Sequence, residues 1–106
     1  MKIVAVTSCL TGIAHTYLAA EALEKHAKAN GFEIKVETQG AIGTENMITL
    51  EEAKSADLVI LTNDIEIDDI ERFEGKHIIQ VSVKDLVMRA NDILKDAEKY
   101  INNIEN

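Results

Sequence analysis

The sequence contains no proline, no tryptophan, one cysteine and only five glycines. A single cysteine excludes an internal disulfide and any metal site built from several thiolates. Because proline and low-complexity stretches are missing, nothing in the composition marks a linker between domains. A chain of 106 residues, 46% of them apolar, has the usual size of one domain with its own core. We therefore predict a single domain over residues 1–106.

Long hydrophobic runs and an excess of basic residues are also missing. No stretch approaches the roughly 18 uninterrupted apolar residues that cross a bilayer, and no basic region precedes the apolar run Ile3–Val6 as it would in a secretory signal. We expect a soluble, cytoplasmic protein. The formal net charge of −8 argues against a general affinity for nucleic acid, which requires a basic face. Any bound anion must be held by local donors, chiefly backbone N–H groups.

Strand-like and helix-like segments alternate along the chain. The expected strands are Lys2–Ser8, Phe32–Thr38, Leu58–Thr62 and His77–Val81, and the expected helices are Ile13–Asn30, Leu50–Ser55 and Lys84–Asn102. This alternation predicts a single-domain α/β fold, Rossmann-like, with a four-stranded parallel sheet and helices on both faces. The second strand alternates strictly between apolar and polar residues, which predicts one solvated face and fits a place at the sheet edge.

The connections between these segments carry their own signals. Gly31 is suited to the left-handed position that ends a helix, and Thr49 with Glu52 has the spacing of a capping box. The segment Gln39–Gly43 is expected to be a loop, in which Gly40 and Gly43 either border a site or only serve a turn. The acidic connection Asn63–Glu74 is expected to contain one helical turn and to be solvated or at an interface, since it lacks the spacing of a calcium loop.

The segment Cys9–Thr16 joins the first strand to the first helix, where α/β proteins most often bind phosphate. Gly12 permits a strained backbone, and the helix N-terminus directs N–H groups toward one point. These groups favour the thiolate of Cys9 and can bind the oxygens of a transferred phosphoryl group. We expect Cys9 to be the nucleophile, with no metal and no cofactor. The phosphate-binding residues would be Leu10, Thr11, Gly12, Ile13, Ala14, His15 and Thr16.

Residue type alone leaves alternatives open at this loop. Cys9 can also be a buried structural cysteine or a redox thiol, and Thr11 and Thr16 can cap the helix instead of binding phosphate. Five residues separate Cys9 from His15, the spacing of the cysteine phosphatase loop, but those enzymes have arginine in place of His15. Because imidazole is a weaker and conditional donor, this difference favours holding a phosphoryl group over hydrolysing it rapidly. The other two histidines, His26 and His77, are expected to be structural.

At this point the sequence resembles the fructose-family IIB components (EIIB) of the phosphoenolpyruvate-dependent sugar phosphotransferase system. The segments that carry the resemblance are Cys9–Thr16, Tyr17, Ala19–Leu23, Glu37–Gly40, Ala56–Asp57, Asp64 and Arg72–Lys76. The family has proline where this chain has Leu10. The position of Asp64 resembles that of a possible general acid.

The resemblance implies a cytoplasmic phosphotransferase that associates with the inner face of the membrane through its partner. Cys9 would accept a phosphoryl group from the phosphohistidine of a IIA component (EIIA) and pass it to a sugar, with fructose as the default. A membrane IIC component (EIIC) would bind and transport that sugar. Two other functions are compatible with the sequence: a hydrolase similar to low-molecular-weight phosphatases, and a non-catalytic binding module on a flavodoxin-like sheet.

Overall fold

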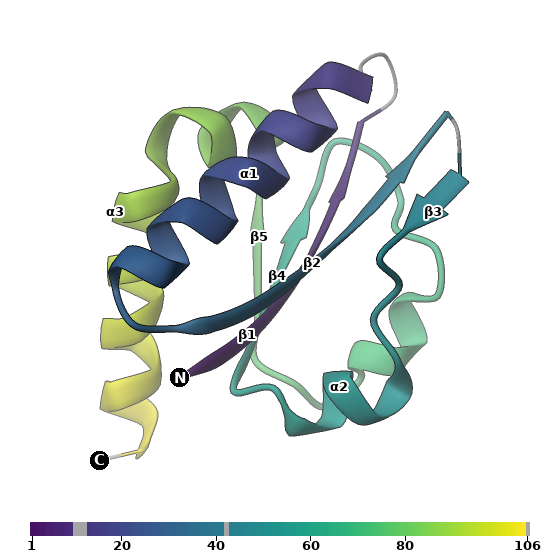
Figure 1. The fold of residues 1–106 in the computed structure, drawn as a ribbon. Coiled ribbons are helices and arrows are strands. Elements are labelled where there is room, and N and C mark those ends of the chain that lie inside the picture. Colours follow the sequence, from purple (N-terminus) through teal and green to yellow (C-terminus); the bar gives the residue numbers. More distant parts are fainter. Residues whose placement is uncertain (10–12, 42, 106) are drawn as a thin grey trace.

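The computed structural model describes residues 1–9, 13–41 and 43–105 and contains one sheet in the order β3-β2-β1-β4-β5 (Figure 1). The strands are β1 (Lys2–Ser8), β2 (Glu33–Gly40), β3 (Gly43–Glu45), β4 (Leu58–Thr62) and β5 (Ile78–Val81). β1, β2, β4 and β5 are parallel, so their carboxyl ends meet at one edge of the sheet. The four predicted parallel strands are confirmed, and β3 is an additional, antiparallel strand.

β3 corrects the prediction of a simple loop after the second strand. β2 continues to Gly40, which pairs with Gly43 across a tight turn, and the φ of +105° at Gly43 is one that glycine adopts readily. The Tyr17 hydroxyl donates a 2.6 Å hydrogen bond to Glu45 of β3, and this bond raises the pKa of Tyr17. β3 occupies the sheet edge, so β2 is an interior strand.

The polar face of β2 also differs from the prediction. Toward its carboxyl end the side chains are buried on both faces, and Glu37 is completely inaccessible to solvent. Glu37 and Arg72 form a salt bridge of 2.6 Å. A charged residue is tolerated in this interior position because its partner and several hydrogen bonds replace water. The predicted solvated face is therefore wrong at this end of the strand.

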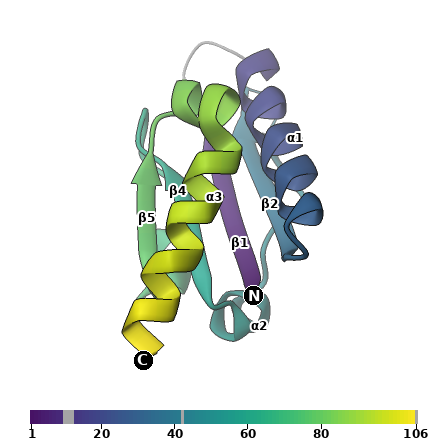
Figure 2. The ribbon, with the colours of Figure 1, turned by 90° about the vertical axis from the view of Figure 1, so that its left-hand side faces the viewer.

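Helices cover both faces of the sheet, as predicted. The helices are α1 (Ile13–Ala29), α2 (Leu50–Ser55) and α3 (Val83–Glu105), and η1 (Ile70–Phe73) is a short 3₁₀ helix. α1 and α3 lie side by side on one face, and α2 and η1 lie on the other (Figures 1 and 2). Alternate residues of β1 and β4 point to the two faces and build two separate hydrophobic layers.

The predicted helix ends agree with local geometry. Gly31 has a φ of +76°, and the Phe32 N–H reaches back to the Ala27 carbonyl at 2.9 Å, which closes the end of α1. At α2, Thr49 and Glu52 form the predicted capping box. The predicted helical turn in the acidic connection is η1. α3 loses helical geometry at Arg89, where φ is −136°, and then continues along the sheet.

Candidate active site at the carboxyl end of β1

Cys9 follows the last residue of β1 at the edge where the parallel strands end. Its side chain is partly exposed and also touches the hydrophobic layer beneath α1 and α3. The alternative of a fully buried structural cysteine is therefore wrong. A thiol in this place is open to a reaction partner while the rigid sheet holds its backbone.

Both sides of the loop that follows Cys9 are tied to the fold. The Thr7 hydroxyl donates to the carbonyl of Thr16 in the first turns of α1, at 3.2 Å. The Ser8 N–H donates to the Thr62 hydroxyl at 2.9 Å, and that hydroxyl donates to the Ser8 carbonyl at 3.2 Å. All four residues are buried. These contacts fix the end of β1 against β4 and α1, so Cys9 starts from a defined position.

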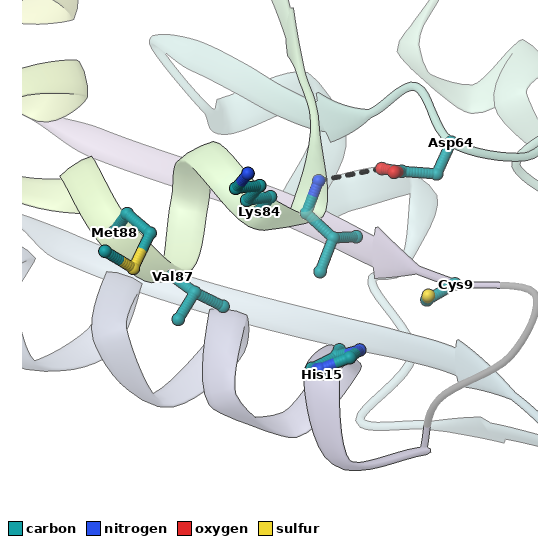
Figure 3. A pocket seen from close by; sticks show the side chains of 7 residues that line it. Cys9, His15, Asp64, Lys84, Val87 and Met88 are labelled. Carbon is teal, nitrogen blue, oxygen red and sulfur yellow. Dashed lines mark hydrogen bonds between the residues drawn. The ribbon is translucent and has the colours of Figure 1, made fainter.

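A pocket of about 390 Å³, here called the α3-side pocket, opens beside Cys9 (Figure 3). Its lining residues are Cys9, His15, Asp64, Val83, Lys84, Val87 and Met88. They come from the end of β1, the first turn of α1, the residues after β4 and the first turns of α3. His15 and Lys84 thus contribute two basic side chains to the pocket that contains the thiol, in a protein whose net charge is −8.

The start of α3 is held by the residues that follow β4 and β5. The Asp64 carboxylate accepts the Val83 N–H at 2.7 Å, the bond drawn in Figure 3, and the Ser82 hydroxyl accepts the Asp85 N–H at 3.0 Å. Asp64, which resembled a possible general acid, thus anchors the α3 N-terminus here. Two helices, α1 and α3, begin next to the thiol, and helix N-termini stabilise negative charge.

A second pocket of about 270 Å³, here called the β2-side pocket, also contains Cys9. Its lining residues are Ser8, Cys9, Gln39, Gly40, Ala41, Ile65, Glu66 and Asp68. Cys9 therefore lies between the two pockets. Gly40 borders this second pocket, as one of the two interpretations of that glycine expected. Gly43 is not among the lining residues and is the first residue of β3.

The structure brings together part of the predicted loop. Cys9 and His15 line one pocket, Ala14 is exposed, Ile13 opens α1, and Thr16 is buried in its first turns. Leu10, Thr11 and Gly12 lie outside the described residues. Neither of the other histidines lines the pockets at Cys9: His26 is partly buried on α1, and the His77 ring meets the Tyr100 ring edge to face at 5.9 Å.

Several residues near Cys9 were not found from the sequence. Thr62 gave a weak signal, because a polar residue ends an otherwise apolar strand. Lys84 and Met88 gave none, since they lie more than 70 positions from Cys9 and reach it only through the fold. Within the described ranges, no three His, Cys, Asp or Glu side chains converge in a way that could hold a metal. None of the described helices has the length and apolar content of a membrane span.

The sequence and the fold match those of known proteins. The family model for the lactose/cellobiose-specific IIB subunit of the phosphotransferase system matches residues 4–96. The chain belongs to the IIB components of the sugar phosphotransferase system. It is therefore a phosphotransferase, and its role in that system is to carry phosphoryl groups.

Individual relatives give the same result. The fructose-like EIIB component 2 of Escherichia coli K12 is 57% identical over 100 residues, which cover 94% of each chain. The fructose-specific EIIB'BC component of Rhodobacter capsulatus is 46% identical over 92% of this chain, which spans 17% of that protein. The solution structure of an enzyme IIB subunit from E. coli K12 is 35% identical, with a TM-score of 0.92 over 99% of this chain and 97% of the other.

Proposed function

We propose that this IIB component accepts its phosphoryl group on Cys9 from the phosphohistidine of a IIA protein. The observation that supports this most directly is the partly exposed thiol at the end of β1, in a pocket that His15 and Lys84 also line and beside the N-termini of two helices. In the described part of the chain, it is also the one sulfur nucleophile. Helix N-termini and basic side chains stabilise a thiolate and the oxygens of a phosphoryl group alike.

The transfer is an exchange of one bond at phosphorus for another in each of two steps. The Cys9 thiolate attacks the phosphorus atom, an S–P bond forms as the P–N bond breaks, and the histidine leaves with the electron pair. In the second step a sugar hydroxyl oxygen attacks the same phosphorus atom. The S–P bond then breaks, the thiolate is restored, and the hydroxyl proton passes to solvent.

We infer that the sugar is fructose or a close relative and is presented by a membrane IIC component. The E. coli EIIB component 2 and the R. capsulatus EIIB'BC component both carry fructose in their names, and the second joins its IIB segment to a much longer chain. The sugar would meet the IIB component at the same edge of the sheet, because the thiol must reach it. Thr11, Gly12 and the neighbouring N–H groups of the loop would hold the phosphoryl oxygens.

The deciding experiment locates the phosphoryl group. The chain is incubated with phosphoenolpyruvate, the general phosphotransferase proteins and a fructose-type IIA protein, and the added mass is mapped to a residue. We expect one thiol-linked phosphoryl group, on Cys9, and none in Cys9→Ser, because a serine hydroxyl stays protonated at neutral pH. Phosphorylation that persists in Cys9→Ser, or wild-type protein that takes up no phosphoryl group, would overturn the proposal.

A further inference from the structure

The side-chain amide of Gln39 connects β2 to the acidic segment that follows β4. Its Nε2 donates to the Glu37 carboxylate at 2.7 Å and to the Asp68 carbonyl at 3.1 Å, and its Oε1 accepts the Asp68 N–H at 2.9 Å. The amide thus binds both backbone groups of Asp68, as a neighbouring β-strand residue would. Gln39 is 6% exposed, so water competes little for these bonds.

A buried ion pair holds this amide in place. The Glu37 carboxylate accepts hydrogen bonds from both terminal nitrogens of Arg72, at 2.6 and 2.7 Å, and from the Ile48 N–H at 2.8 Å. Arg72 also donates to the carbonyl oxygens of Ile48, Asp68 and Asp69, at 2.8, 3.3 and 3.0 Å. The Asp68 carbonyl therefore receives donors from both Gln39 and Arg72, and the backbone of this segment has a fixed distance from β2.

The place of Gln39 relative to Cys9 gives this network a role in the reaction. Gln39 pairs with Ser8 in the register of β1 and β2, one residue before the thiol. It lines the β2-side pocket together with Cys9, and Ile65, Glu66 and Asp68 of the segment after β4 form another part of the wall of that pocket. Glu66 and Asp68 are exposed. The position of this wall thus determines how a protein donor can approach the sulfur from that side.

We propose that Gln39 is a positioning residue for phosphoryl uptake. By binding the backbone of Asp68, it fixes segment 65–68 as the wall against which the phosphohistidine-bearing donor protein docks at Cys9. This inference rests on the proposed function of Cys9. The hydrogen bonds described for the Gln39 side chain all lead to Glu37 and Asp68, and none of them reaches His15 or Lys84. Losing them should therefore weaken docking of the donor and leave the bond exchange at sulfur intact.

The test measures single-turnover transfer from a phosphorylated fructose-type IIA protein at increasing IIA concentrations. Gln39→Met removes the amide at similar length, and Gln39→Asn retains an amide that is one methylene too short to reach Asp68. For both variants we expect the half-saturating IIA concentration to rise about tenfold while the saturating rate stays within about twofold, the pattern of lost binding without lost catalysis. Exchange of the Asp68 amide hydrogen should become about tenfold faster, because its acceptor is gone.

Lys35→Met is the matched control on the same strand. Lys35 lies four residues before Gln39 in β2. The variant removes the 2.7 Å hydrogen bond from Lys35 to Glu52 and should change neither the half-saturating IIA concentration nor the saturating rate. The inference is overturned if the half-saturating concentration is unchanged in variants whose Asp68 amide exchanges faster, or if only the saturating rate falls. Wild-type protein that takes up no phosphoryl group would instead overturn the proposed function, and this inference with it.

Discussion

His15 places an imidazole in the pocket of Cys9, where the cysteine phosphatases have the forked guanidinium of arginine. The imidazole is exposed on the first turn of α1 and lines the α3-side pocket. A guanidinium at this position would contact two phosphoryl oxygens at once and stabilise the transition state for attack by water. We therefore expect His15→Arg to hydrolyse its phosphocysteine faster than wild-type protein, by about tenfold or more, as one added transition-state donor does.

The measurement follows the loss of phosphoryl groups from isolated phosphoprotein in the absence of sugar and IIC. His77→Arg is the control, because His77 is exposed and lies just before β5, at the opposite edge of the sheet. Equal lifetimes for wild type and His15→Arg would show that residue 15 does not decide between carriage and hydrolysis.

The buried carboxylate of Glu37 makes stability depend on pH. Burial raises the pKa of Glu37, but hydrogen bonds from Arg72, the Ile48 N–H and Gln39 outweigh burial and hold the pKa below its ordinary value of 4.5. The folded state thus prefers the ionised form, while the unfolded state binds a proton near pH 4.5. Stability from this group is complete above that pH and is lost as pH falls through the lower, folded pKa.

Glu37→Gln tests this directly in urea titrations across that pH range. At neutral pH the variant leaves the largely buried Arg72 guanidinium without its carboxylate partner, and we expect it to lose about 3–5 kcal/mol of unfolding free energy. Below about pH 4.5 the difference from wild type should shrink, because the unfolded wild-type chain then binds a proton at Glu37 that the folded state takes up only at lower pH. Gln80→Ala, an exposed change without a carboxyl group, is the control. A difference that stays constant with pH would contradict the assignment.

At the level of helices and strands, the sequence predicted those elements whose own residue pattern determines their structure. α1, for example, presents buried residues such as Leu23 and Ala27 at helical spacing, and β4 is apolar up to its last residue and buried on both faces. β3 could not be found this way, because three exposed residues carry no periodic pattern and are held by pairing with β2. The burial of Glu37 was missed for a similar reason: Arg72 lies 35 positions away.

The same distinction applies to the candidate site, where some residues are adjacent in sequence and others are brought together only by the fold. Cys9 and His15 were found because a strand end, a glycine and a helix start are adjacent in sequence. Lys84 and the wall at Asp68 were not found, because only the sheet topology brings the start of α3 and the segment after β4 to the thiol. The residues that give the loop its chemistry are close in sequence, whereas the residues that form the surfaces around it are far apart in sequence.

α2 is the element most dependent on its cap. It has six residues, too few for a helix to be stable by itself, and its capping box joins Thr49 and Glu52 through bonds of 2.9 and 3.1 Å. Hydrogen bonds from Lys35 and from Thr49 lower the pKa of Glu52 to about 2, so the box stays ionised at neutral pH. We expect Thr49→Ala to lower the unfolding free energy by about 1 kcal/mol.

Urea denaturation at pH 7 measures this loss. Thr44→Ala is the matched control, because Thr44 is exposed on the edge strand β3 and caps no helix. A loss in Thr49→Ala no larger than that in Thr44→Ala would show that packing alone holds α2.

On the scale of the whole molecule, the sheet separates two hydrophobic layers that share no side chain. Ile3 of β1 belongs to the layer under α1 and α3, and Ile48 belongs to the layer with α2 and η1. Both are buried, with exposures of 0% and 1%. The backbone of β1 and β4 contributes to both layers, so we expect them to unfold together in one transition.

Ile3→Val and Ile48→Val test whether the two layers unfold in one transition and whether their side chains interact. Each removes one buried methyl group and should cost about 0.5–1.5 kcal/mol of unfolding free energy. In the double variant the losses should add to within about 0.5 kcal/mol, because side chains on opposite faces of a sheet have no common packing partners. Urea unfolding followed by circular dichroism and by amide hydrogen exchange in each layer measures both quantities. Two separate transitions, or a coupling above about 1 kcal/mol, would contradict a rigid sheet between independent layers.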